Sequence, residues 1–178
     1  EHINAASMHQ NIGSILQQEG RLAEAEQELL RAREIREKAL GPGHPEVATL
    51  RANIGALLVE RGQYAAAEAE LRRSLNDLEA ALGAEHADLA DPLLGLAELL
   101  LRTGRGAEAV APAERAYGLV AEGQASVRAS AAFALARALV AAGGDRTRAA
   151  TLGREALGRW AAGSKERGEV ERWLARHG

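Results

Sequence analysis

The sequence predicts an all-α protein built as a solenoid, in which one helical unit recurs along the chain. Two unrelated residue types share a period of 42 residues, which indicates an array and not a single-core globule. The period is carried by three histidines and three glycines, namely His2, His44, His86, Gly20, Gly62 and Gly104. Alanine and leucine, both strong helix formers, supply most of the apolar residues. We therefore expect about four helix–turn–helix repeats and a capping helix.

Repeat one, residues 1–43, contains two segments whose apolar residues follow helical spacing. The first segment ends at Gly20, because glycine accepts the left-handed backbone at a helix C-terminus. The second segment runs from Leu22 to about Leu40, and Gly41-Pro42-Gly43 then breaks the pattern.

Repeats two and three, residues 44–85 and 86–125, follow the same plan. Four helices are expected, over residues 47–61, 64–82, 87–101 and 107–120. Pro45 suits the first position of a helix. Pro92 marks either a late start or a kink in its helix, and Pro112 bends its helix slightly.

Repeat four, residues 126–163, is degenerate, because Gly104 and Gly143 are separated by 39 residues and not 42. The missing residues fall in the connection over residues 121–125. Residues 164–178 form the capping helix, which shields the end of the stack. Its N-cap is Ser164, its apolar stripe is Val170, Trp173 and Leu174, and its expected packing partner is Trp160.

The net charge of −3 argues against a nucleic-acid-binding protein, which normally carries a basic face. Residues 1–101, the acidic front, hold 9 Lys/Arg and 17 Asp/Glu, whereas residues 102–178, the basic rear, hold 13 and 8. This asymmetry either lets copies associate head-to-tail or reflects drift on solvated faces. No apolar run approaches the roughly 20 residues that span a membrane, and no signal-like segment opens the chain. We expect a cytoplasmic piece of a longer polypeptide.

The sequence predicts no enzyme, no cofactor and no metal site. Repeat-equivalent histidines lie roughly 10 Å apart, whereas zinc ligands lie about 2 Å from one ion, so we expect His2, His44 and His86 to cap and pack the loops between repeats. Phosphate-binding and nucleophile motifs are absent, as is cysteine. The carboxylate pairs Glu26/Glu28 and Glu68/Glu70 are expected to be solvated, with helical neighbours such as Arg31, Arg72 and Arg73 as partners.

The motifs that recur at this period resemble those of a known family. Repeat two reads Asn53-Ile54-Gly55, Gly62-Gln63-Tyr64, Ala67-Glu68, Leu82-Gly83 and His86, and repeat one shares most of these positions. The chain resembles the tetratricopeptide repeat (TPR), in the 42-residue variety found in kinesin light chains and many bacterial signalling proteins. The resemblance covers about nine-tenths of the chain. It implies a right-handed superhelix that binds proteins.

The resemblance also implies where a partner binds, since the first helices of such arrays line a concave groove. The implied groove residues are Gln10, Asn11, Ser14 and Gln17, then Thr49, Asn53, Ala56 and Glu60, then Asp91, Leu94, Glu98 and Leu101, and finally Phe133 and Arg137. Asn11 and Asn53 match the family asparagine that hydrogen-bonds a peptide backbone, whereas Gly95 and Ala134 stand at the equivalent positions of the later repeats.

Three functions remain open from the sequence. The leading hypothesis is a protein–protein interaction scaffold that holds a peptide or helix in its groove, within a larger bacterial signalling protein. The first alternative is a structural module that self-associates head-to-tail. The second is a regulatory arm of a serine/threonine kinase.

Overall fold

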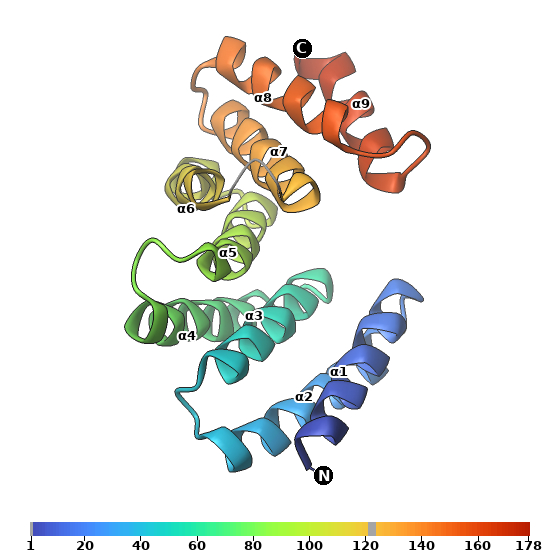
Figure 1. Ribbon diagram of the computed structural model, residues 1–178. Helices are drawn as coiled ribbons and strands as arrows, with labels where there is room; N and C mark the ends of the chain where they lie inside the picture. Colours follow the sequence, from blue (N-terminus) through green and yellow to red (C-terminus); the bar gives the residue numbers. More distant parts are fainter. Residues whose placement is uncertain (1, 121–123) are drawn as a thin grey trace. The chain divides into compact units, whose positions relative to one another are not determined.

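The structure, a computed structural model, describes residues 2–120 and 124–178, and every regular element in these ranges is helical (Figure 1). The elements are α1 (His2–Gln18), α2 (Leu22–Leu40), α3 (Pro45–Glu60), α4 (Tyr64–Leu82), the 3₁₀ turn η1 (Ala87–Leu89), α5 (Ala90–Arg102), α6 (Gly106–Leu119), α7 (Ala125–Ala141), α8 (Arg146–Arg159) and α9 (Lys165–His177). The prediction of an all-α solenoid is confirmed. Residues 121–123, within the shortened connection, lie outside the described residues.

The chain divides into two compact parts, an N-terminal half of residues 1–95 and a C-terminal half of residues 96–178. In the N-terminal half, α1 pairs with α2 and α3 pairs with α4, and α2 packs on α3 (Figure 1). Gly20 and Gly62 end the first helices with φ angles of +77° and +73°. A side chain is strained at such angles, so glycine stops both helices as predicted.

Two of the periodic histidines cap helices. The Nδ1 atom of His44 accepts a hydrogen bond from the amide of Glu46 at 3.2 Å, and His86 accepts one from Asp88 at the same distance. Each ring satisfies an amide that has no partner within its own helix. The capping role is confirmed for both residues. The side chain of His2 lies outside the described residues.

Close helix packing in the N-terminal half depends on glycines that face leucines. A Cβ atom placed on Gly55 would lie 2.6 Å from Cγ of Leu71, and one placed on Gly95 would lie 2.5 Å from Cδ2 of the same side chain. Leu71 of α4 is fully buried between α3 and α5. Gly13 of α1 faces Leu29 of α2 in the same way, at 2.9 Å.

Both prolines of repeat three lie within helices of the structure. Pro92 follows η1, so the helix of repeat three starts late, at Ala90. The alternative that fits is therefore the late start. Pro112 lies inside α6 as expected.

In the C-terminal half, the degenerate repeat four still forms a complete helix pair, since α7 packs on α8. The capping helix α9 packs on α8, and the hydroxyl of Ser164 accepts from the amide of Arg167 at 3.2 Å, which confirms the N-cap. Trp173 is buried, and its ring lies edge-on to Phe133 of α7 at 5.7 Å and tilted against His177 at 5.2 Å. The carbonyl of Trp160 accepts a hydrogen bond from Arg167 of α9 at 3.4 Å.

Within residues 2–120 and 124–178, no helix combines the length and apolar character that a membrane crossing requires.

Candidate functional site

The first helix of repeat two, α3, is buried around most of its circumference. Its half-buried and exposed residues are Pro45, Glu46, Thr49, Asn53, Ala56 and Glu60. These include all four residues that the family resemblance assigned to a groove in this repeat. Their strip is therefore the surface of α3 that a partner can reach.

The strip continues onto α1 within the N-terminal half. The amide of Gln17 on α1 donates to the carboxylate of Glu60 on α3 at 2.5 Å, which joins the strips of two successive repeats. Gln10 is half-buried and accepts from the guanidinium of Arg36 at 2.8 Å. These two contacts fix Gln10 and Gln17 in place, and so limit what either can offer to a partner.

Asn11 and Asn53 occupy equivalent positions on α1 and α3. Asn11 is exposed and Asn53 is half-buried, and neither side-chain amide hydrogen-bonds another residue of the described chain. Ser14 and Thr49, in contrast, donate to backbone carbonyls four residues earlier in their helices, at 3.1 and 3.0 Å. The two asparagine amides are thus polar groups of the strip whose donors and acceptors are unused within the described chain.

The predicted residues of α5 divide between the two halves of the chain. Asp91 and Leu94 belong to the N-terminal half, and Glu98 and Leu101 belong to the C-terminal half. Asp91 is partly exposed, yet the loss of water around its carboxyl group and the nearby charge of Asp88 raise its pKa. Leu94, Glu98 and Leu101 are half-buried.

In the C-terminal half, Glu98 of α5 accepts hydrogen bonds from Arg137 of α7 at 2.6 Å and from Arg102 at 2.7 Å. Burial opposes ionisation of Glu98, but the charges of Arg137 and Arg102 outweigh it and lower the pKa of the carboxyl group. Because Glu98 already neutralises Arg137, an incoming carboxylate would compete with it. Phe133 packs on Trp173, so it supports α9 as well as the accessible face of α7.

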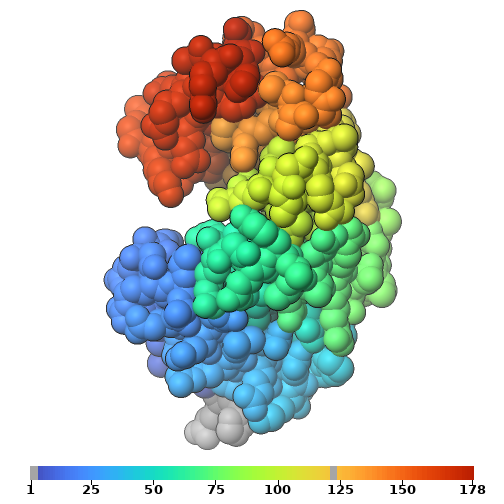
Figure 2. All heavy atoms as spheres, turned by 180° about the vertical axis from the view of Figure 1, so that it is seen from behind, coloured from blue at the N-terminus to red at the C-terminus, as the bar shows by residue number. Residues whose placement is uncertain are grey.

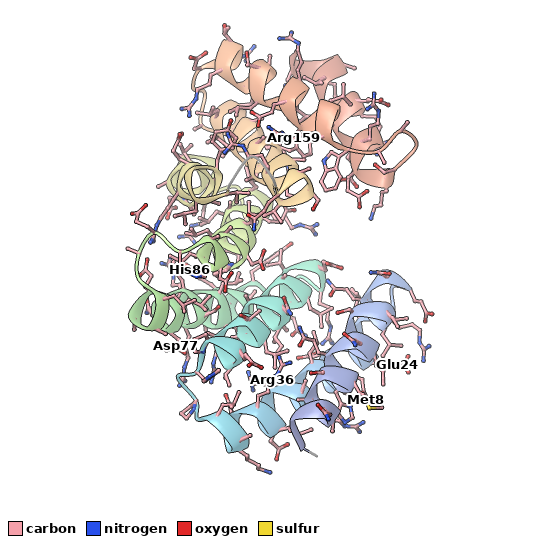
Figure 3. All side chains as sticks on the ribbon, viewed as in Figure 1. Met8, Glu24, Arg36, Asp77, His86 and Arg159 are labelled. Carbon is pink, nitrogen blue, oxygen red and sulfur yellow. The ribbon has the colours of Figure 1, made fainter. Side chains whose placement is uncertain are left out.

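Behind the strip of α3 lies a cluster of ion pairs that the sequence reasoning missed. The guanidinium of Arg51 is buried, and it lies 2.5 Å from Glu37 of α2 and 3.3 Å from Glu70 of α4. Asp77 of α4, labelled in Figure 3, lies 3.9 Å away. Glu70 also accepts from Arg33 of α2 at 2.9 Å. The cluster therefore joins repeat one to repeat two.

This cluster corrects one expectation about the carboxylate pairs. Glu68 does pair within its helix, with Arg72 at 2.7 Å, but Glu70 pairs across repeats and Glu26 pairs with Arg61 at the end of α3. The expectation of solvated, helix-local partners is wrong for Glu26 and Glu70. The signal in the sequence was Arg51, a charged residue on an otherwise apolar helix face.

Comparison with known proteins identifies the family to which the chain is similar. A family model described as tetratricopeptide repeat matches residues 4–80 and 53–122, which together exceed half of the chain. No curated protein matches in sequence. Among solved structures, BtubC (BKLC) from P. vanneervenii has a TM-score of 0.72 and 18% identity, over 96% of this chain and 64% of that chain. This chain thus spans just under two thirds of the length of BtubC.

A second solved structure has a similar relationship to this chain. It is a Podosopora anserina protein described as a kinesin light chain with nearly identical TPR-like repeats, with a TM-score of 0.75 and 22% identity, over 99% of this chain and 86% of that chain. A variant of the same protein matches with a TM-score of 0.76. At these identities the likeness shows the fold alone. The family-model match, the 42-residue period and the paired helices together show that this chain belongs to the tetratricopeptide repeat family.

Proposed function

We propose that this chain is a protein-interaction scaffold, and that the faces of its first helices hold an extended peptide or a helix of a protein partner. The observation that carries the proposal is the pair of amides on Asn11 and Asn53, one repeat apart and without a partner in the described chain. We further propose that it acts in the cytoplasm, within a larger bacterial signalling protein, since the 42-residue repeat variety that it resembles occurs there.

The chemistry of the amides fits a peptide backbone. Each asparagine side chain offers both donors and an acceptor, which are the groups that a peptide unit needs. Asn11 and Asn53 lie on the first helices of successive repeats, so they would contact different peptide groups of one extended segment. Such contacts recognise backbone geometry with little dependence on the sequence of the partner.

Selection from a displayed library of random peptides, with this 178-residue chain as bait, tests this proposal. The dissociation constant of each selected peptide is then measured by fluorescence anisotropy. We expect the double variant Asn11→Ala/Asn53→Ala to bind at least tenfold more weakly. The matched control is Gln27→Ala/Asn76→Ala, which removes two exposed amides from the second helices α2 and α4. Unchanged affinity in the first variant would show that the groove is elsewhere.

Head-to-tail self-assembly is a second candidate function, favoured by the acidic front and basic rear of the sequence. Sedimentation velocity across a salt series separates it from the first. Association through opposite charges weakens as salt rises, because exposed charges are screened. A monomer at low salt and high concentration would remove this candidate.

A further inference from the structure

The basic residues of the N-terminal half lie away from its first helices. Of the nine lysine and arginine residues in this half, only Arg51 belongs to α1, to α3 or to residues 87–95. Arg51 is buried, and its guanidinium contacts Glu37 of α2 and Glu70 of α4. The strip on α1 and α3 therefore carries no lysine or arginine. The other eight belong to the second helices or to the turns that precede them, namely Arg21, Arg31, Arg33, Arg36, Lys38, Arg61, Arg72 and Arg73.

Glu60, the last residue of α3, has a charge that no cation of the described chain neutralises. It is exposed, and its one hydrogen bond is the 2.5 Å contact from the neutral amide of Gln17. That amide donates to Oε1, so Oε2 accepts no hydrogen bond within the described chain. Glu46, at the other end of α3, differs because it lies 3.2 Å from Arg36. Glu60 is therefore a negative group of the strip that can accept from an incoming cation.

A second carboxylate without a cation stands on the next first helix. Asp91 of α5 is partly exposed, and the loss of water around its carboxyl group together with the charge of Asp88 raises its pKa. A neighbouring guanidinium would lower the pKa instead, as the arginines around Glu98 do for that residue. The first helices of the N-terminal half thus offer a partner uncompensated negative charge, and no lysine or arginine is accessible on them.

Glu60 lies within reach of a partner that the two asparagines hold. It stands seven residues after Asn53, which is about two turns along the same face of α3. Its contact with Gln17 places it at the junction with α1, and Figure 2 shows the blue atoms of α1 beside the green atoms of repeat two. A long basic side chain of a segment bound at Asn11 and Asn53 can therefore extend to this carboxylate.

We propose that the partner segment is basic, and that Glu60 selects a lysine or an arginine within it. This inference rests on the proposed function, because it names the chemistry of the partner for the same surface. The cation would donate to Oε2 of Glu60 in a charge-assisted hydrogen bond. An acidic side chain would instead meet like charge and find no lysine or arginine on the strip. The asparagines recognise the backbone of the segment, and Glu60 adds a preference for its side chains.

Three pools of synthetic twelve-residue peptides are the probe. Every third position is Lys in the first pool, Gln in the second and Glu in the third, and the remaining positions vary among uncharged residues. Fluorescence anisotropy gives the dissociation constant of each pool for this 178-residue chain. We expect the Lys pool to bind at least threefold more tightly than the Gln pool, and the Glu pool to bind most weakly. The preference for Lys should shrink as salt rises, because exposed charges are screened.

Protein variants separate a contact with Glu60 from general attraction to an acidic chain. Glu60→Gln keeps an acceptor for Gln17 and removes the charge, so it should weaken the Lys pool at least threefold and change the Gln pool less than twofold. The matched control is Glu34→Gln, which removes the same charge from an exposed position on the second helix α2 and should change both pools less than twofold. Glu60→Lys should reverse the order, so that the Glu pool binds more tightly than the Lys pool. Circular dichroism confirms that each variant remains folded.

The possible results distinguish this inference from the proposed function. Equal dissociation constants for the three pools, or a preference for Lys that survives in Glu60→Gln, would overturn the inference. The proposed groove would still stand in that case if Asn11→Ala/Asn53→Ala weakened the binding of every pool. A failure of all three pools to bind would overturn the groove, and the inference together with it.

Discussion

The substitution Gly55→Ala tests whether the close approach of α3 and α4 is as tight as the geometry indicates. The added methyl group would lie 2.6 Å from Cγ and 2.8 Å from Cδ2 of Leu71. Ordinary contact between carbon atoms begins at about 3.5 Å, so Leu71 must move by nearly 1 Å. Its retreat is blocked on the other side, because Cδ2 already lies where a Cβ atom on Gly95 would stand.

Two effects of opposite sign set the magnitude. Replacing glycine by alanine inside a helix stabilises by roughly 0.5–1 kcal/mol. Overpacking a core costs typically 1–3 kcal/mol, and the trapped position of Leu71 favours the upper part of that range. We therefore expect Gly55→Ala to destabilise the protein by about 1–2 kcal/mol. The overpacking term wins because Leu71 has no free space to enter.

Urea denaturation followed by circular dichroism at 222 nm measures the effect. The control is Gly118→Ala on α6, where an added Cβ meets nothing within 4 Å, and this variant should stabilise by up to about 1 kcal/mol. In a double-mutant cycle, Leu71→Ala should cost less in the Gly55→Ala background than in the parent, with a coupling of at least about 0.5 kcal/mol. If Gly55→Ala stabilises the protein as Gly118→Ala does, the reasoning about this contact is wrong.

Three further predictions concern caps and charge. Ser164→Ala removes the N-cap of α9 and should lower stability by about 0.5–2 kcal/mol, measured by the fluorescence of Trp160 and Trp173 in urea. His86→Ala should speed hydrogen exchange of the Asp88 amide several-fold, because that amide loses its acceptor, whereas His86→Asn should retain most of the protection. The pKa of Glu98 is lowered in the folded protein. As pH falls below about 4.5, the unfolded chain therefore takes up a proton at this residue before the folded chain does, and the free energy of unfolding decreases. In Glu98→Gln the urea midpoint should decline less between pH 5 and pH 3.

The sequence predicts the fold well because its strongest signals are local. Gly20 and Gly62 stop helices through their own backbone conformation, and Ser164 and His44 cap helices through atoms within three residues of them. Such effects repeat wherever the residues repeat, so a period read from the sequence becomes a period in the structure. Even repeat four forms a helix pair, because small residues such as Ala136 and Ala149 keep its buried positions.

Contacts between repeats are predicted less well, because they depend on how one helix pair rests on the next. Glu70 could pair with Arg73 in its own helix, as helical spacing allows, or with an arginine of repeat one. In the structure it accepts from Arg33 of repeat one at 2.9 Å, and also from the guanidinium of Arg51 within repeat two, which is buried and must be paired. The contact of Trp173 with Phe133 was missed for a similar reason, since Phe133 lies on α7 and not on α8, the helix that precedes α9 in the chain.

At the asparagine positions of the proposed groove, the local repeat pattern and the packing between repeats both decide which residue is present. Asn11 and Asn53 recur at the period of the repeat, but the equivalent residue of repeat three is Gly95. The sequence alone shows only that the asparagine is absent from this position of repeat three. The structure supplies a physical reason, because a Cβ atom at position 95 would lie 2.5 Å from Leu71. Any side chain there would displace the same leucine that Gly55 accommodates. The close approach of α5 to α4 therefore accounts for the loss of the amide in repeat three, and it limits the proposed backbone contacts of the N-terminal half to α1 and α3.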